Sequence, residues 1–158
     1  MPGLSFLGLL TKNRLLSDYK RTQAVWYAKR LLFLPYLWGG DDPMAGFDCS
    51  GLVLEVLQSV GKIKHKIDMT ADSLYKSFMD KQVPKGYAGC LVFWFKGTKA
   101  AHVEMMINDC FLIGSSGGSS KTLNRQQAIE QNAFIKMRPL GYRRGPYKIV
   151  DPFMVKKK

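Results

Sequence analysis

The sequence lacks the features that place a chain in a membrane, a metal-dependent fold or a disulfide-bonded scaffold. Its 158 residues contain no run of about 18 apolar residues, the length that a membrane-spanning helix requires. Three cysteines are too few, and odd in number, for a disulfide framework, so at least one thiol stays free. The two histidines lie far apart and no Cys or His pair has zinc-ligand spacing, so we expect no metal and no other cofactor.

Acidic side chains are scarce relative to basic ones. The chain has 24 Lys and Arg against 12 Asp and Glu, a formal net charge of +12 that draws it toward polyanions. Nucleic acid, anionic lipid and acidic cell-wall polymers are therefore candidate partners. An apolar patch at residues 4–10 is followed by Lys12 and Arg14 without a small-residue cleavage pattern, so we expect no secretory signal peptide.

The remaining pattern predicts a single α+β domain in which N-terminal helices pack on a small antiparallel sheet. Helical periodicity comes first along the chain and short strand-like runs follow. We expect helices over residues 22–34, 49–60, 70–79 and 125–132, and strands over residues 90–95, 102–107, 110–114 and 133–138. Residues 1–21 would form an N-terminal extension, residues 22–140 the domain and residues 141–158 a basic C-terminal tail.

Within that tail, residues 142–148 (YRRGPYK) interleave aromatic and basic side chains. Such a segment could bind single-stranded nucleic acid by stacking and charge. A solvated terminal segment explains the same pattern, and we favour it, so nucleic acid is not an expected partner.

The most informative stretch is residues 36–51, YLWGGDDPMAGFDCSG, because it places Cys49 at the first turn of an apolar-striped helix behind a glycine-rich turn. The free amides and positive dipole end of a helix N-terminus favour a thiolate over a thiol and can hold an oxyanion. Asp48 is placed to cap this helix, and Ser50 flanks the thiol on the other side. A structural cysteine buried at a helix start fits the same spacing.

A thiolate nucleophile needs a base, and the sequence offers two histidines. His65 lies in a basic loop, KIKHK, and is expected to be solvated. His102 opens a strand in which alternate residues such as Val103 face the core, while His102 and Glu104 face the other side. His102 is therefore the candidate base for Cys49.

These residues resemble the NlpC-type cell-wall cysteine peptidases, whose fold is a minimal papain. The resemblance covers about residues 23–139, and its motifs are a Tyr-x-Trp-Gly-Gly at 36–40, an Asp-Cys-Ser-Gly at 48–51 and the strand beginning His102-Val103. It implies cleavage of amide bonds in peptidoglycan stem peptides or cross-links. It also implies thiolate attack, an acyl-enzyme and hydrolysis by water.

The resemblance also implies the roles of individual residues. Cys49 would be the nucleophile, His102 the general base, and Tyr36 would place a hydroxyl near the thiolate and the oxyanion. Trp38 would form a substrate wall or a lid over the thiol. Asp48 and Ser50 complete the expected oxyanion and substrate region.

One position departs from the family pattern. A third polar residue, often His, orients the base from the next strand, and Gly114 stands at that place. A backbone carbonyl, a water, Glu104, Ser115 or Ser116 would have to replace it. Glu104 is two residues from His102, about 7 Å along a strand, which is long for a direct contact.

This departure leaves alternatives open. The same fold could serve as a catalytically weak or inactive structural or wall-binding module, or as an acyltransferase or lipid-acting relative. Residues 113–122, 128–138 and 150–153 look like the forms of the family encoded by tailed bacteriophages and prophages. That likeness implies virion or tail proteins as partners, beside peptidoglycan, and a location in a virion or at the bacterial cell wall.

Overall fold

A five-stranded antiparallel sheet forms the frame of the molecule. The computed structural model describes residues 6–155, and the strands lie in the spatial order β6, β5, β4, β3, β7. Their bounds are β3 Leu91–Lys96, β4 Lys99–Met106, β5 Phe111–Ser116, β6 Phe134–Pro139 and β7 Tyr147–Val150. A separate two-stranded sheet, β1 Asp41–Asp42 and β2 Gly46–Phe47, precedes the helix that carries Cys49.

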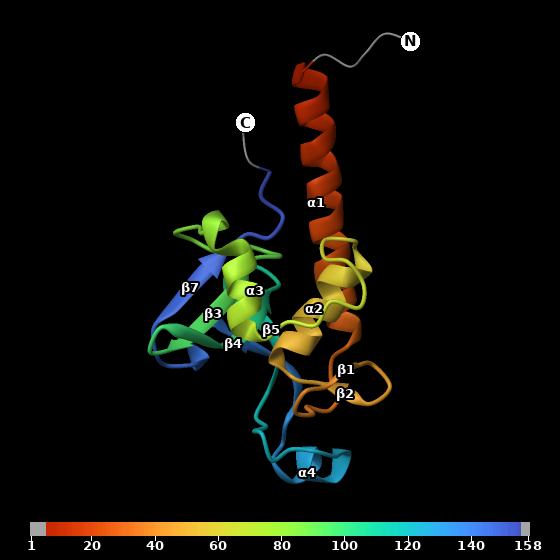
Figure 1. Ribbon diagram of the computed structural model, residues 1–158, viewed down its shortest axis with the longest axis vertical. Helices are drawn as coiled ribbons and strands as arrows, with labels where there is room; N and C mark the ends of the chain where they lie inside the picture. The colour runs from red at the N-terminus through yellow and green to blue at the C-terminus, as the bar shows by residue number, and fades with distance from the viewer. Residues whose placement is uncertain (1–5, 156–158) are drawn as a thin grey trace.

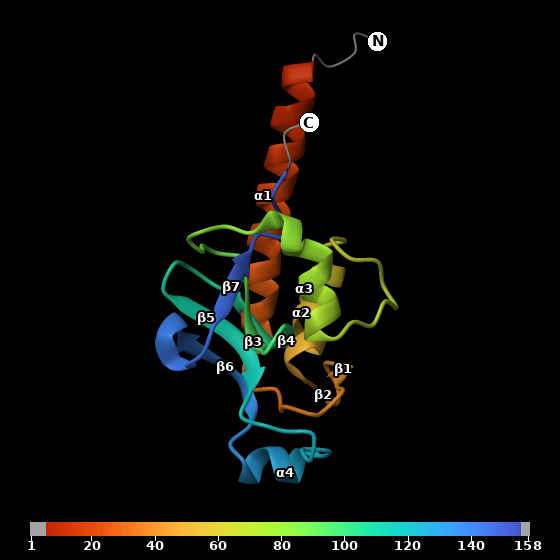
Figure 2. The ribbon, with the colours of Figure 1, turned by 60° about the vertical axis from the view of Figure 1, so that its left-hand side comes forward.

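Helices cover one face of the five-stranded sheet. Helices α2 (Cys49–Ser59) and α3 (Ala71–Phe78) pack against β4, and Figures 1 and 2 show both on the same side of the strands. The main hydrophobic core lies between these layers and contains Leu57, Leu74 and Val103. The predicted α+β class, with helices packed on a small antiparallel sheet, is confirmed.

The opposite face of the sheet carries a smaller apolar cluster that includes Val92, Trp94 and Met106. The 3₁₀ helix Leu140–Tyr142 contributes partly buried side chains to it. Alternation along β4 places Val103 in the main core and Met106 in this second cluster, as the sequence predicts. His102 and Glu104 therefore lie on the face away from α2 and α3.

The first helix differs from its predicted bounds. Helix α1 spans Phe6–Arg30, so it begins well before residue 22 and ends before residue 34. It ends early because Phe33 adopts a left-handed conformation with φ +70° and the next residues bond to β6, as when the Phe33 amide donates to the Ile135 carbonyl at 3.0 Å. The end of α1 nearer the body buries Ala24 and Ala28, whereas its other half projects from the body (Figure 1).

The C-terminal residues are the second departure. We expected a solvated segment after residue 140, but β7 pairs with β3 in antiparallel register, with Val150 opposite Leu91. Val150 and Phe153 are buried, which explains the pairing because these apolar side chains complete the core. Residues 156–158 of the predicted tail lie outside the described residues.

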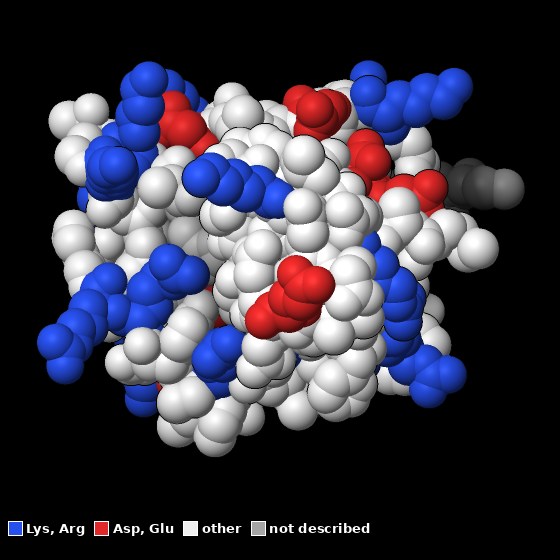
Figure 3. Space-filling model, turned by 90° about the horizontal axis from the view of Figure 1, so that it is seen from below, with Lys and Arg blue, Asp and Glu red and all other residues white. Residues whose placement is uncertain are grey.

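A hairpin turn and a short helix lie at opposite ends of strand β5. Helix α4 spans Arg125–Glu130 and begins at the cap residue Asn124. The turn between β4 and β5 is closed by the Asn108 side chain, which accepts from the amides of Cys110 and Phe111, and this confirms the predicted hairpin. Seen from the α4 end, Lys and Arg side chains predominate on the sheet side of the surface (Figure 3).

Candidate active site

Cys49 is the first residue of helix α2, and its position is fixed by the side chain of Asp48. One carboxylate oxygen of Asp48 accepts from the Gly51 amide at 2.8 Å, which caps the helix. The other oxygen accepts from the Gly39 amide at 3.1 Å, and the Ser50 hydroxyl donates to the carboxylate at 3.1 Å. Asp48 and Ser50 therefore hold the glycine turn against the helix start, and their polar atoms are engaged with each other.

Two glycines let the first turn of α2 lie directly against that turn. A Cβ atom on Gly51 would lie only 2.0 Å from the carbonyl oxygen of Gly40. Any larger residue at this position would separate the helix start from the turn. The Gly-Gly and Cys-Ser-Gly motifs therefore have a packing reason, which is to place the Cys49 backbone and thiol beside His102 of β4, the central strand of the sheet.

His102 faces the Cys49 thiol from strand β4. Its side chain is almost fully buried, and its ring lies 5.6 Å from the ring of Trp94 between centroids. Burial by itself lowers the pKa of His102, but hydrogen bonds to Cys49 and Glu104, together with the charges of both groups, outweigh burial and raise the pKa to about 9. The site thus favours an imidazolium beside the sulfur.

Glu104 contacts His102 directly, so the expectation that it would lie too far away was wrong. The Nε2 atom of His102 lies 2.8 Å from Oε1 of Glu104, and only 1% of Glu104 is exposed. The two side chains leave the same face of one strand and bend toward each other along it. Gly114 on the adjacent strand makes room, because a Cβ atom there would lie 2.3 Å from Cγ of Glu104.

Tyr142 supports the same carboxylate from behind. Its hydroxyl donates to Oε1 of Glu104. Burial, followed by the charge of Glu104 and its hydrogen bond, raises the pKa of Tyr142 to about 12, so the hydroxyl stays protonated and donates at neutral pH. Tyr142, Glu104 and His102 form a connected row that ends at Cys49.

The serines offered as substitutes for a third residue are not in this row. Ser115 points to the core side of β5, where its hydroxyl donates to the Phe47 carbonyl at 2.6 Å. Ser116 is buried, lines the cleft beside Cys49, and its hydroxyl has no hydrogen-bond partner among the described residues. Glu104 is therefore the side chain that contacts His102, whereas Ser115 is hydrogen-bonded to the Phe47 backbone on the other face of the sheet.

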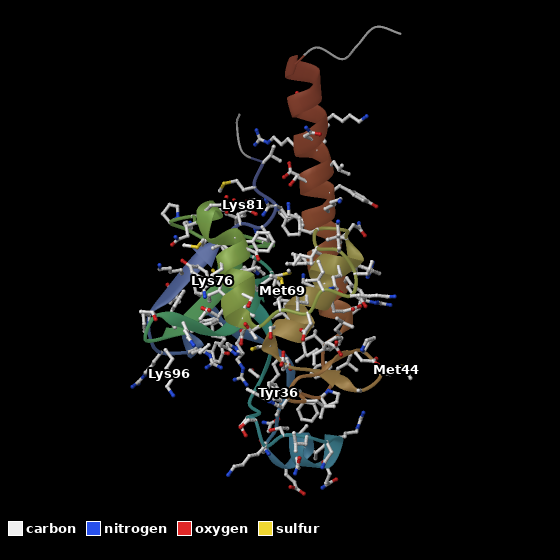
Figure 4. All side chains as sticks on the ribbon, viewed as in Figure 1. Tyr36, Met44, Met69, Lys76, Lys81 and Lys96 are labelled. Carbon is white, nitrogen blue, oxygen red and sulfur yellow. The ribbon has the colours of Figure 1, made fainter. Side chains whose placement is uncertain are left out.

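Tyr36 and Trp38 form part of a cleft of about 360 Å³ that also contains Cys49 and His102. Burial, followed by the charges of Cys49 and Asp48, raises the pKa of Tyr36 above its ordinary value, so its hydroxyl stays a donor. Figure 4 places Tyr36 between the lower end of the sheet and α4, where its ring packs with Ala128. Trp38 is 56% exposed and lies at the rim of the cleft as a wall.

Comparison with known proteins decides what this arrangement represents. Residues 34–139, about two thirds of the chain, match the NlpC/P60 family. This chain belongs to the NlpC/P60 family. The family predicted from the Asp-Cys-Ser-Gly motif is therefore confirmed, and so is the fold.

Two curated relatives of this NlpC/P60 domain are bacterial. It is 49% identical over 41 residues to the murein DD-endopeptidase MepH of Escherichia coli, covering 26% of this chain and 14% of that protein. It is 31% identical over 85 residues to the bifunctional muramidase/DL-endopeptidase CwlT of Bacillus subtilis, covering 52% of this chain and 25% of that protein. The chain thus matches a quarter or less of the length of these relatives.

Solved structures share the fold at lower identity. The NlpC/P60 domain of the peptidoglycan hydrolase SagA superposes with a TM-score of 0.63 at 22% identity, covering 83% of this chain and 97% of that one. The P60 domain of an antigen from M. avium subspecies paratuberculosis gives a TM-score of 0.67 at 19% identity, covering 88% and 98%.

Several residues that line the cleft of this NlpC/P60 domain were not predicted from the sequence. Lys96, Arg143 and Arg144 all lie along it, and Tyr142 lies behind it. The interleaved aromatic and basic residues at 142–148 were the signal, but the pattern gives no indication that this segment returns to the sheet. Among residues 6–155 no cluster of His, Cys, Asp and Glu could hold a metal ion, and none of the described helices could span a membrane.

Proposed function

We propose that this NlpC/P60 domain is a cysteine endopeptidase or amidase that cleaves amide bonds in peptidoglycan stem peptides or cross-links. The observation that carries the proposal is the position of His102, which lines one cleft with Cys49 and lies 2.8 Å from Glu104 between Nε2 and Oε1. The names of the two curated relatives, a murein DD-endopeptidase and a DL-endopeptidase, support the substrate class.

The first half of the reaction forms an acyl-enzyme. The Cys49 thiolate, paired with the His102 imidazolium, attacks the carbonyl carbon of the scissile amide. The backbone amides at the start of α2 and the Tyr36 hydroxyl stabilise the oxyanion that develops. His102 then gives its proton to the leaving amine, the C–N bond breaks, and a thioester to Cys49 remains.

The second half releases the product. Neutral His102 takes a proton from water, the hydroxide attacks the thioester, and the carboxylic acid leaves as the Cys49 thiolate and the imidazolium are restored. Glu104 holds the imidazole in the orientation and tautomer that this transfer requires, and Tyr142 holds Glu104. The Glu104 contact supports the enzyme over a wall-binding module that has lost hydrolysis.

Digestion of purified peptidoglycan tests the proposal. Wild type, Cys49→Ala and the control Cys110→Ala, which removes an exposed thiol in the β4–β5 turn, are incubated with the polymer and the released fragments are analysed by mass spectrometry. We expect fragments with new amino and carboxyl ends from wild type and Cys110→Ala, and none from Cys49→Ala. Equal release by Cys49→Ala would refute the nucleophile, and no release by folded, reduced wild type would favour the binding module.

Where the enzyme acts is a separate proposal. The likeness of residues 113–122, 128–138 and 150–153 to forms encoded by tailed phages supports a virion or tail association, whereas the family supports action at the bacterial cell wall. Immunodetection of the chain in purified phage particles tests the association. Its absence from such particles would contradict the virion association and leave only the action at the cell wall.

A further inference from the structure

One side of the catalytic cleft is lined by cations. Lys96 extends from the end of β3, at the lower left of Figure 4, and Arg143 and Arg144 follow the 3₁₀ helix that ends β6. All three border the cleft that contains Cys49 and His102, and no Asp or Glu is among the described residues that line it. Within residues 6–155, no salt bridge joins these three cations to a carboxylate.

Arg143 is held in place by aromatic rings and not by an acidic partner. Its guanidinium carbon lies 5.7 Å from the ring centres of both Trp94 and Tyr142, and its Nε atom donates to the Tyr142 hydroxyl at 3.4 Å. Stacking of this kind orients the guanidinium plane without neutralising it. The remaining N–H groups of Arg143 are thus pre-oriented donors beside the cleft.

This arrangement fits a carboxylate. A guanidinium binds a carboxylate through two parallel, charge-assisted hydrogen bonds, and neighbouring cations strengthen the attraction. A carboxamide in the same place would present one acceptor and one amino group, and would bring no charge. The glutamyl residue of a stem peptide carries either group next to the amide bond, so these three cations have a chemical basis for distinguishing the two forms.

We propose that Lys96, Arg143 and Arg144 form a carboxylate-binding wall that makes this domain select stem peptides with a free carboxylate beside the scissile bond over their amidated forms. The inference rests on the proposed function for its biological meaning. Lys96 lies within the part of the chain that matches the family, residues 34–139, whereas Arg143 and Arg144 follow it, so two of the three cations come from the C-terminal segment.

Binding to a variant that cannot hydrolyse its ligand tests the wall separately from catalysis. The probes are two synthetic tripeptide amides, L-alanyl-γ-D-glutamyl-L-lysinamide and the same peptide with the glutamyl α-carboxylate converted to an amide. Both are titrated into full-length Cys49→Ala, and quenching of tryptophan fluorescence is followed, since Trp38 and Trp94 line the cleft. We expect the acidic peptide to bind roughly ten- to a hundredfold more tightly, as one charge-assisted hydrogen-bonded pair allows.

Charge variants then locate the source of the preference. Lys96→Gln/Arg144→Gln and Arg143→Gln, each made in Cys49→Ala, should bring the ratio of the two affinities close to 1. The control Lys29→Gln/Lys64→Gln removes two exposed cations outside the cleft lining and should leave the ratio unchanged. Arg143→Lys should lose part of the preference, because it keeps the charge but loses the planar fork.

Each outcome decides between the two proposals. Equal binding of the two peptides, tighter binding of the amidated one, or an unchanged ratio in the charge variants would overturn the wall even if wild type cleaves peptidoglycan. A preference that is lost in the charge variants supports the wall even if wild type proves unable to cleave. Rising salt should also lower the preference, because the wall is partly exposed.

Discussion

At the residue scale, the burial of His102 and its neighbours Cys49 and Glu104 together determine how the site responds to pH. An unperturbed His has a pKa near 6.5, whereas that of His102 is raised to about 9. Because the folded state holds this proton more tightly, the associated stability is fully present below about pH 6.5 and is lost as pH rises through about 9. The imidazolium needed to protonate the leaving amine therefore persists well above neutral pH.

We predict that Glu104→Gln lowers kcat/KM by roughly ten- to a hundredfold, the size expected for loss of a charge-assisted hydrogen bond. The same change should move the alkaline limb of the pH profile from near 9 to lower pH, because one of the groups that raise the pKa of His102 is neutralised. Hydrolysis of a stem peptide measured across pH checks both effects. Glu130→Gln, on the exposed side of α4, is the control, and an unmoved alkaline limb in Glu104→Gln would contradict the role.

Gly114 gives a second prediction at this scale. A Cβ atom at residue 114 would lie 2.3 Å from Cγ of Glu104, so Gly114→Ala must displace the carboxylate that holds His102. We expect a fall in kcat/KM similar to that of Glu104→Gln while the protein stays folded. Gly141→Ala is a matched control, because a Cβ atom there would meet nothing within 4 Å. Steady-state kinetics beside circular dichroism makes the comparison, and full activity in Gly114→Ala would argue against the packing.

At the element scale, the start of α2 contributes both to the stability of the fold and to the position of the nucleophile, because the cap residue Asp48 precedes Cys49. Asp48 caps α2 and also bonds the Gly39 amide, while Thr70 caps α3 through its hydroxyl, which accepts from the Ser73 amide at 3.2 Å. Removing either cap should cost about 1–2 kcal/mol of the free energy of unfolding. Only the first should also affect Cys49, because only α2 carries the nucleophile.

We therefore predict that Asp48→Ala and Thr70→Ala lower the free energy of unfolding by similar amounts, but that Asp48→Ala alone lowers kcat strongly. Urea titrations of both variants give the stabilities and a stem-peptide assay gives the rates. If both variants kept the wild-type rate under conditions where they are folded, the turn held by Asp48 would have no part in positioning the thiol.

The sequence predicts these elements well where the signal is local. The cap at Asp48, the apolar stripe of α2 and the alternation along β4 each depend on residues that lie close in sequence, and each is confirmed. Glu104 was one of several candidates to replace the third residue, but the sequence could not single it out, because its contact with His102 depends on a glycine that the adjacent strand β5 brings alongside. Tyr142 and Arg143 were missed for the same reason, since only tertiary pairing returns them to the site.

At the scale of the whole molecule, helix α1 and the segment after β7 are joined by one cluster of contacts around the buried carboxylate of Asp151. Arg21 of α1 makes two hydrogen bonds of 3.0 Å with the carboxylate of Asp151, which follows β7. Tyr87 donates to the same carboxylate at 2.7 Å, and the ring of Phe153 lies 5.4 Å from the guanidinium carbon of Arg21. This cluster thus connects residues from all three predicted segments, which are the extension before residue 22, the domain and the tail after residue 140.

This cluster yields the last prediction. Asp151 is 1% exposed, so Asp151→Ala leaves the Arg21 guanidinium and the Tyr87 hydroxyl without their shared partner. Loss of one member of a buried pair should cost about 3–5 kcal/mol. Lys76→Ala, which breaks the more exposed pair between Lys76 and Asp72, should cost far less than Asp151→Ala and serves as the control.

Urea denaturation followed by fluorescence and by circular dichroism measures the effect. If α1 and the segment after β7 are part of the same cooperative unit as the catalytic cleft, both signals from Asp151→Ala should shift together to lower urea. An independent extension or tail would instead melt in a separate, earlier transition while the midpoint of the core stayed unchanged. A single shifted transition would mean that the segment holding Tyr142 and Arg143 at the cleft folds with the nucleophile's own helix, so the wall and the catalytic row form together.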